Sequence, residues 1–85
     1  MRHFKDPKFK PHYDSLPVSI QSLADKSFAL LKDNPRHPSL PFKRIDGDLW
    51  SVRVGLNYRA LATEGEDGFQ WFWFGTLSEY ARILK

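Results

Sequence analysis

The chain of 85 residues contains no cysteine, and none of its apolar runs approaches the roughly 20 residues that a membrane-spanning helix needs. Without cysteine it has no disulfide, no thiolate nucleophile and none of the cysteine ligands of common structural zinc sites. Its polar first residues, 1–6, lack the apolar stretch of a secretory signal. These absences lead us to expect a soluble protein of the cytoplasm.

The chain is rich in aromatic residues and carries a small excess of positive charge. Apolar residues make up 41% of the sequence and aromatic residues 15%, which is enough for one compact core in a domain of this size. Thirteen lysines and arginines outnumber ten carboxylates, and the net charge of +3 suits a partner that carries phosphates. The three histidines show no spacing typical of metal ligands. We expect a single domain over residues 1–85, with no metal site and no cofactor.

Two helices are predicted in the first half of the chain, after residues 2–6, which leave room for a brief edge strand. Pro7 or Pro11 can open a short first helix. Pro17 suits the first turn of the second helix, and Asn34-Pro35 ends it. The residues of its amphipathic pattern are Ile20, Leu23, Ala24, Ser27, Phe28 and Leu31.

The second half of the chain changes to the two-residue alternation of strands. The predicted strands are residues 42–45, 49–54, 58–63 and 69–74, separated by glycine-containing turns that include the acidic turn 64–68. A short helix from Leu77 to Leu84 follows, capped by Thr76 or Ser78. The expected fold class is therefore α+β, with an N-terminal helical pair packed on an antiparallel meander sheet and a short C-terminal helix.

Arg53 and Arg59 are the most informative residues of the chain. They flank the turn 55–57, and if this turn takes three residues the two arginines face each other across the strand pair. A two-residue turn would instead send Arg59 to the other face of the sheet. Because like charges placed opposite each other destabilise a strand pair, we interpret the two arginines as a clamp for a shared anion, with phosphate the best candidate. The alternative is two surface arginines, each paired with a nearby carboxylate.

The meander also predicts where charge gathers. Alternate turns of a meander lie at the same end, so the turns 46–48 and 64–68 bring five of the ten carboxylates together, away from the arginines. Lys43 lies near the beginning of the first meander strand and is expected at the arginine end. Because Lys43 and Arg44 point to opposite faces, only one of them can share the face of the arginine pair. Both are candidates for contacts with a nucleic-acid backbone, and a solvated strand edge is the alternative.

Two further residues are candidates for work beside the clamp. Tyr80 falls in the last helix, where it could stack a base or orient a 2′-hydroxyl, and packing of the helix onto the sheet is the alternative. His37 lies in the proline-rich connector 34–41 that leads to the first meander strand, and it is a candidate acid–base group.

The strand 69–74 is apolar on both of its faces. We expect the helical pair to cover one face. We expect the other face to be open to a partner, because three short helices scarcely cover both sides of a sheet.

Six motifs stand out between Pro17 and Leu84. They are Asn34-Pro35-Arg36-His37-Pro38-Ser39-Leu40, Phe42-Lys43, Leu49-Trp50-Ser51-Val52-Arg53-Val54, Tyr58-Arg59-Ala60-Leu61, Trp71-Phe72-Trp73-Phe74-Gly75 and Glu79-Tyr80. Together they resemble the RelE/ParE superfamily of bacterial type II toxins, and most closely its plasmid stabilisation or translational repressor subgroup.

This resemblance implies a microbial RNase-like fold and an antitoxin protein that neutralises the chain. In ribonuclease members of the superfamily it implies cleavage of messenger RNA on the ribosome, with the 2′-hydroxyl of the RNA as nucleophile and no metal ion. Arg53 and Arg59 match the basic strand residues that hold the phosphate. Lys43 and Arg44 are then the candidates for RNA binding, and Tyr80 is a candidate for proton transfer together with the histidine of the connector.

Two positions depart from the superfamily pattern. Ser51 stands where some ribonuclease members have a lysine, and Leu77, which cannot transfer a proton, stands where many have a histidine or a basic residue. Despite these departures, the resemblance leads us to expect a toxin that is a ribosome-dependent mRNA endoribonuclease. The alternatives are a non-enzymatic inhibitor of DNA gyrase and an inactive homologue that acts only as a binding partner.

Overall fold

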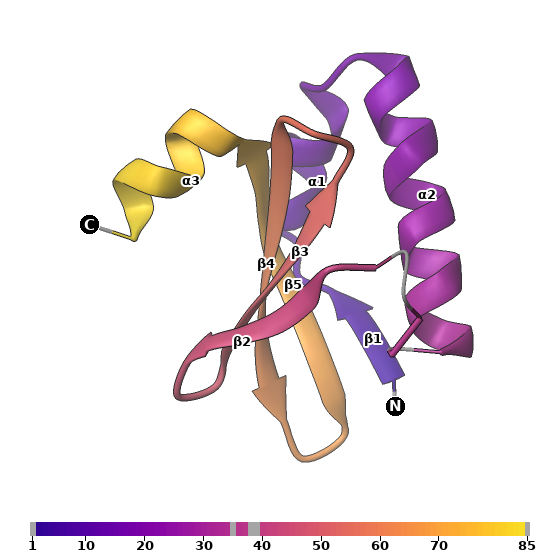
Figure 1. Cartoon of the computed structure of the whole chain (residues 1–85), viewed down its shortest axis with the longest axis vertical. Helices are drawn as coiled ribbons and strands as arrows, with labels where there is room; N and C mark the ends of the chain where they lie inside the picture. Colours follow the sequence, from indigo (N-terminus) through magenta and orange to yellow (C-terminus); the bar gives the residue numbers. More distant parts are fainter. Residues whose placement is uncertain (1, 35, 38–39, 85) are drawn as a thin grey trace.

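The computed structural model describes residues 2–34, 36–37 and 40–84, which form five strands and three helices (Figure 1). In chain order these are β1 (Arg2–Lys5), α1 (Phe9–Asp14), α2 (Val18–Asp33), β2 (Phe42–Asp46), β3 (Leu49–Val54), β4 (Tyr58–Gly65), β5 (Gly68–Thr76) and α3 (Leu77–Ile83). Asn34 is the C-cap residue of α2. Pro35, which was predicted to end this helix together with Asn34, lies outside the described residues. No helix of this described part is long and apolar enough to cross a membrane.

The strands form one sheet in the order β1-β5-β4-β3-β2. Strands β2 to β5 follow one another as antiparallel neighbours, whereas β1 pairs in parallel with β5. Figure 1 shows α1 and α2 on one side of this sheet and α3 on the other. The predicted α+β fold is confirmed, and the brief edge strand that the sequence allowed adds a parallel pairing to the meander.

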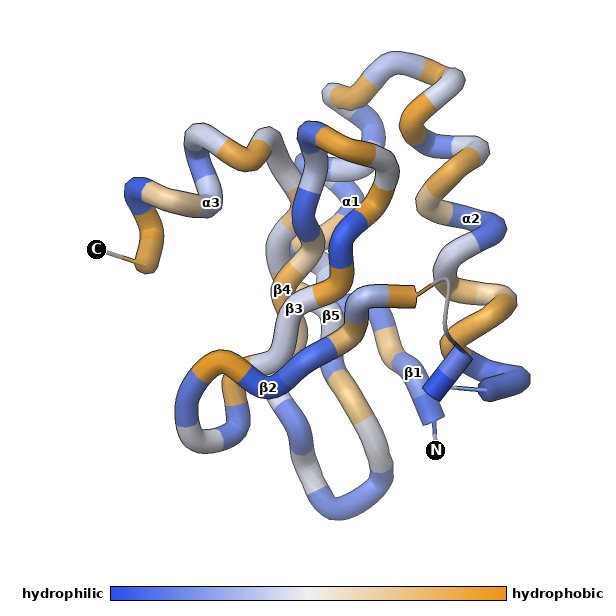
Figure 2. The backbone as a smooth tube through the Cα atoms, in the orientation of Figure 1, coloured by the Kyte–Doolittle hydropathy of each residue, from blue (hydrophilic) through white to orange (hydrophobic). Residues whose placement is uncertain are grey.

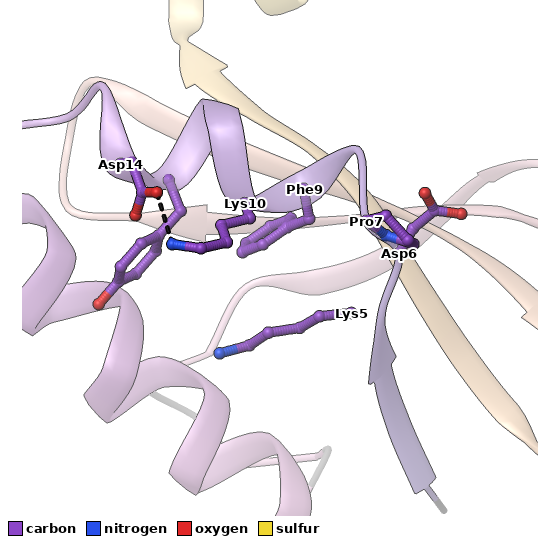
Figure 3. A pocket seen from close by; sticks show the side chains of 7 residues that line it. Lys5, Asp6, Pro7, Phe9, Lys10 and Asp14 are labelled. Carbon is purple, nitrogen blue, oxygen red and sulfur yellow. Dashed lines mark hydrogen bonds and ion pairs between the residues drawn. The ribbon is translucent and has the colours of Figure 1, made fainter.

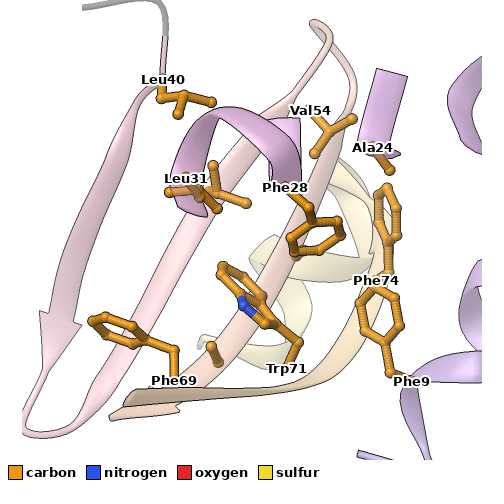
Figure 4. Close-up of a cluster of buried hydrophobic side chains, with 12 residues drawn as sticks. Phe9, Ala24, Phe28, Leu31, Leu40, Val54, Phe69, Trp71 and Phe74 are labelled. Atoms are coloured by element: carbon orange, nitrogen blue, oxygen red, sulfur yellow. The ribbon is translucent and has the colours of Figure 1, made fainter. Parts of the chain in front are cut away.

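A core rich in aromatic side chains lies between the helical pair and the sheet (Figure 4). Phe28 packs edge-on against Trp71, with ring centres 5.1 Å apart, and Phe9 stacks on Phe74 at 5.8 Å. The apolar residues of α2 recur once per turn, as the alternating bands along the helix in Figure 2 show, and Ala24, Phe28 and Leu31 enter the core. Burial of each such large side chain stabilises the fold by about 1.5–3 kcal/mol, which fixes the face of the sheet that the helices cover.

A bulge in the β4–β5 ladder decides which aromatic residues of β5 enter this core. Strict alternation would place Trp73 on the same face as Trp71. The register shifts between Leu61, which pairs with Trp73, and Ala62, which pairs with Trp71. Phe74 therefore joins Trp71 in the core, and Trp73 turns to the other face. The strand is apolar on both faces as predicted, but α3 covers part of the second face that was expected to be open to a partner.

The turns between β3 and β4 and between β4 and β5 differ in how well the sequence predicts them. The turn 55–57 takes three residues, with Val54 paired to Tyr58 across it, and Gly55 adopts a φ of 65°, which favours glycine. The predicted acidic turn 64–68 is too long. Gly65 pairs with Gly68, so β4 and β5 extend into the predicted turn and leave only residues 66–67 between them.

The side chain of Lys5 extends from β1 towards the helical pair and contacts aromatic rings of both helices (Figure 3). Its Nζ lies 5.4 Å from the ring centre of Phe28 and 5.7 Å from that of Tyr13, within cation–π distance. Beside it, Lys10 and Asp14 form an ion pair of 2.7 Å, the one ion pair within the described ranges. The edge strand is therefore held by side-chain contacts as well as by its ladder with β5.

His3 lies two residues before Lys5, on the same side of β1, and also contacts the core. Trp71 Nε1 donates a hydrogen bond to His3 Nδ1 at 3.1 Å, and the imidazole stacks on the ring of Phe69 with centres 5.5 Å apart. A ring nitrogen that accepts a hydrogen bond carries no proton, so this contact requires a neutral imidazole. Burial lowers the pKa of His3 from its ordinary 6.5, and the positive charges of the N-terminus and of Lys32 lower it further.

Acidification is expected to destabilise the fold through His3. As the pH falls, the unfolded chain takes up this proton near pH 6.5, and the folded chain takes it up only at a lower pH. The contribution to stability is thus complete above pH 6.5 and is lost as the pH falls towards the lowered pKa of the folded state. Denaturant unfolding over this pH range measures the effect. His3→Gln keeps an acceptor for Trp71 but cannot gain a proton, so it should flatten the pH dependence, and an unchanged dependence would contradict this account.

Candidate functional site

The structure places Arg53 and Arg59 opposite each other on β3 and β4. Val52, Val54 and Ala60 are buried in the core under the helical pair, so the alternation of the strands directs the two arginines to the other side of the sheet. We call this side the arginine face. It carries Lys43, Ser51, Arg53, Arg59, Leu61 and Trp73.

Neither arginine has a carboxylate partner among the residues that the structure describes. The Lys10–Asp14 pair remains the one ion pair there. Arg59 is half-buried and its Nη1 donates to the carbonyl of Tyr58 at 2.9 Å, while Arg53 is exposed. The alternative in which each arginine pairs with its own carboxylate is therefore wrong for this part of the chain. The remaining donors of two guanidinium groups on neighbouring strands are available to an external anion.

Helix α3 is fixed to the end of β5 by a capping box. Thr76 Oγ1 accepts from the N–H of Glu79 at 3.2 Å, and Glu79 Oε1 accepts from the N–H of Thr76 at 2.9 Å. The N–H and the hydroxyl of Thr76 both donate to the Glu79 carboxylate, and these two bonds lower the pKa of Glu79. The N–H of Leu77 donates to the carbonyl of Asn57 at 2.7 Å, which ties α3 to the turn between the two arginines. Thr76, and not Ser78, is the cap.

Tyr80 reaches from α3 across the arginine face. The guanidinium carbon of Arg59 lies 5.9 Å from the centre of the Tyr80 ring, and the Tyr80 hydroxyl donates to Ser51 Oγ at 3.4 Å. Ser51 is only 2% exposed and is the buried polar residue of this face. Tyr80 therefore packs the helix onto the sheet, which was the alternative for it, and also borders the arginine pair as expected.

Lys43 shares the arginine face, and Arg44 does not. The β2–β3 ladder pairs Lys43 with Ser51 and Arg44 with Trp50. Trp50 packs against the core on the helix side, so Arg44 belongs to that side of the sheet. Of the two predicted RNA-binding residues, only Lys43 lies on the arginine face.

His37 lies beside the end of α2. Its N–H donates to the carbonyl of Asn34 at 3.0 Å, and its own carbonyl accepts from the N–H of Leu40 at 2.9 Å. Pro35, Pro38 and Ser39 of the proline-rich motif lie outside the described residues. The role of His37 as an acid–base group stays a prediction.

The carboxylates gather at the opposite end of the sheet, as the meander predicts. The N–H of Glu64 donates to the carbonyl of Asp48 at 2.7 Å, so the two acidic turns are adjacent. A hollow of about 480 Å³ there is lined by four carboxylates, those of Asp48, Glu64, Glu66 and Asp67. Within the described residues, no three histidine or carboxylate side chains are arranged to hold a metal ion. The positive potential of the molecule is thus concentrated towards the arginine end.

The arginine face also includes Ser51, Trp73 and Gly75. Strand alternation predicts the position of Ser51 but not that of Trp73. Ser51 stands two residues before Arg53, so strand alternation alone places it on the same face. Trp73 could not be placed in this way, because the bulge in β5 interrupts the alternation. A methyl group on Gly75 would lie 2.5 Å from Cζ2 of Trp73, so the indole packs closely over this glycine.

Gly75→Ala is expected to destabilise the fold by about 1–3 kcal/mol, the usual cost of an added methyl group in a well-packed site. The new Cβ would lie 2.5 Å from Trp73 Cζ2 and 2.9 Å from Glu79 Oε1, so the indole and the capping box must both shift. Gly65→Ala is the matched control in the same hairpin, because the nearest atom to its added Cβ is 3.8 Å away. Denaturant unfolding of both variants tests this, and equal losses would show that Gly75 has no special role.

Comparison with known proteins places the fold. No protein-family model and no curated protein matches the sequence. A chain of the RelB-RelE antitoxin-toxin complex from Methanococcus jannaschii matches with a TM-score of 0.77 and 15% identity, over 96% of this chain and 99% of that chain. A chain of the archaeal RelE-RelB complex from Pyrococcus horikoshii matches with a TM-score of 0.66 and 16% identity, over 88% and 92% of the two chains.

The isolated RelE toxin from E. coli matches with a TM-score of 0.66 and 13% identity, over 98% of this chain and 97% of the toxin. These three matches span nearly the whole chain in each case. The chain therefore has the same fold as these RelE structures, as the resemblance implied.

Proposed function

We propose that the chain is the toxin of a type II toxin–antitoxin pair and that it inhibits translation by cutting messenger RNA on the ribosome. The observation that carries the proposal is the pair Arg53 and Arg59, which face each other without a carboxylate partner in the described part of the chain. The second support is the fold, which the chain shares with solved structures of a RelE toxin and of RelB-RelE complexes.

The proposed reaction uses the 2′-hydroxyl of the RNA as nucleophile. Its oxygen bonds to the neighbouring phosphorus and gives up its proton, and the bond to the 5′-oxygen breaks as that oxygen gains one. The products are a 2′,3′-cyclic phosphate and a free 5′-hydroxyl. Negative charge grows on the phosphoryl oxygens in the transition state, and the guanidinium groups of Arg53 and Arg59 offset it.

The other residues of the arginine face have supporting roles in this proposal. Lys43, on the same face as the clamp, holds the RNA backbone without reading its sequence. Tyr80 is the first candidate for proton transfer, because its ring borders Arg59. His37 is the second candidate. Arg44 would contact RNA only away from the clamp, on the other side of the sheet.

The proposed partners are an antitoxin, the ribosome and messenger RNA, all in the cytoplasm. The Methanococcus and Pyrococcus structures are complexes of an antitoxin with a toxin, and we propose a corresponding antitoxin for this chain. An acidic segment of that protein suits the arginine face, because Arg53 and Arg59 have no carboxylate of their own among the described residues.

One observation favours a second candidate, a non-enzymatic inhibitor of DNA gyrase or an inactive homologue. The Ser51 hydroxyl is buried under Tyr80 and Leu77 begins α3, so neither position supplies the basic or proton-transferring side chain that the resemblance implies there. Arg53 and Arg59 would then bind a protein or nucleic-acid anion without cleaving it.

Arg59→Ala is expected to abolish cleavage while the fold persists. Removing one such charge-stabilising donor typically lowers the rate by about 10²–10³-fold. The experiment adds purified protein to a translation reaction and measures mRNA cuts by primer extension, with and without ribosomes. Arg44→Ala is the matched control, since it removes an arginine from the other side of the sheet and should leave cleavage within about twofold, as surface substitutions usually do.

Cleavage that survives in Arg59→Ala, or that falls equally in both variants, would overturn the clamp. Translation arrest by the wild-type chain with intact mRNA would exclude the ribonuclease. Inhibition of DNA supercoiling by the same preparation would favour the gyrase candidate.

Co-expression is expected to reveal the antitoxin. The open reading frame beside the gene should encode a short acidic protein that restores growth and co-purifies with the chain. Charge reversal in Arg53→Glu should weaken this complex more than Arg44→Glu does, because Arg53 lies on the arginine face and Arg44 on the other side of the sheet. The difference should be largest at low salt, where exposed charges are screened least. Equal affinities for the two variants would place the antitoxin away from the arginine face.

A further inference from the structure

A second hollow lies on the arginine side of the sheet, beside helix α3. It has a volume of about 420 Å³ and is lined by Trp73 of β5 and by Glu79, Arg82 and Ile83 of α3. Glu79, Arg82 and Ile83 follow one another at helical spacing, so they form one side of α3. Tyr80 lies on another side of the same helix, where it contacts Ser51. Helix α3 therefore borders two places at once, the arginine pair and this hollow.

Trp73 has no role in the core of the molecule. It is half-buried and absent from the cluster under α1 and α2, to which the other two tryptophans, Trp50 and Trp71, contribute. Its indole packs over Gly75, and the His12 ring lies 6.0 Å away. A partly exposed tryptophan that lines a hollow and is held from one side by a glycine is a platform on which a flat ring can stack.

The hollow is one strand away from the clamp. Arg53, Arg59 and Gly75 form one row across β3, β4 and β5. Neighbouring strands lie about 4.8 Å apart, so the row spans roughly 10 Å. On the proposed function, the nucleotide next to a phosphate held by Arg59 is the one that would lie towards Trp73.

The polar groups of the hollow suit a nucleobase. Arg82 adds a positive charge beside the aromatic ring, the combination that single-stranded nucleic acids favour. Glu79 Oε1 accepts hydrogen bonds from the N–H and the hydroxyl of Thr76, at 2.9 and 3.0 Å. Glu79 Oε2 has no hydrogen-bond partner among the described residues. That oxygen can accept from an amino group on the edge of a base. A purine with an amino group offers both this donor and the larger stacking area.

We propose that this hollow is a subsite for a purine base of single-stranded RNA, with Trp73 as the stacking platform and Arg82 and Glu79 as its polar contacts. The inference rests on the proposed function for the identity of the ligand and goes beyond it by naming the base that flanks the held phosphate. Ile83, which is 49% exposed, also lines the hollow, so a protein side chain as the occupant is the competing outcome.

The test measures binding without cleavage. The purified chain is titrated at low salt with a 2′-O-methyl oligoadenylate, which has no free 2′-hydroxyl, and with the corresponding oligouridylate. Stacking on an aromatic side chain contributes about 1–3 kcal/mol per base, so Trp73→Leu should weaken oligoadenylate binding about 5- to 150-fold. It should also remove the preference for oligoadenylate. Trp73→Phe should restore part of the affinity, and Arg82→Ala should weaken the binding of both oligonucleotides.

A second measurement needs no variant at the platform. In NMR spectra the indole N–H of Trp73 should shift on addition of the oligoadenylate, while those of Trp50 and Trp71 stay in place. Equal affinity of the wild type and a folded Trp73→Leu chain would overturn the subsite, and so would an unmoved Trp73 resonance or the absence of any binding. Cleavage is scored separately. A chain that binds oligoadenylate through Trp73 but cuts no mRNA keeps the subsite and loses the ribonuclease, whereas a chain that cuts mRNA with unchanged binding in Trp73→Leu loses only the subsite.

Discussion

The register between β3 and β4 is the constraint on which the rest of the site depends. The turn takes three residues, and Gly55 in it adopts a φ of 65°. This length brings Arg53 opposite Arg59. A slip of one residue would carry Arg59 to the side of the sheet that the helical pair covers, where a charge cannot be accommodated without a partner. This register forms despite the repulsion between the two arginines because Val54 and Tyr58, which lie between them in the sequence, pair with each other and pack on the core side of the sheet.

The same register gives the two sides of the sheet different roles: one side carries the core, and the other is the arginine face. The aromatic core under α1 and α2 supplies most of the apolar burial, so the other face is free to carry charge. Helix α3 covers that face only in part. Its capping box and the bond from Leu77 to Asn57 fix it beside the turn, and Tyr80 and Arg82 extend from it to the two places where an RNA chain is proposed to lie. One short helix thereby positions both parts of the site.

Much of this arrangement could be predicted from the sequence, because periodicity and turn chemistry act locally. If the turn at Gly55 takes three residues, strand alternation predicts the opposed arginines, and helical spacing predicts the face of α2 that enters the core. Two features depend on pairing between distant segments and could not be predicted. The bulge in β5 sends Trp73 away from Trp71, and the register of β2 against β3 selects Lys43 over Arg44 for the arginine face. Both outcomes are decided by partner strands and not by the local pattern.

The central claim is that the arginine pair acts on RNA that the ribosome is translating. Mapping of RNA 5′ ends across the transcriptome after a brief pulse of expression in cells tests it most directly. The account predicts new 5′ ends inside translated codons, carrying a 5′-hydroxyl, and their absence when Arg59 is replaced by alanine. Growth arrest with no new ends inside coding regions, or the same ends in both strains, would contradict it.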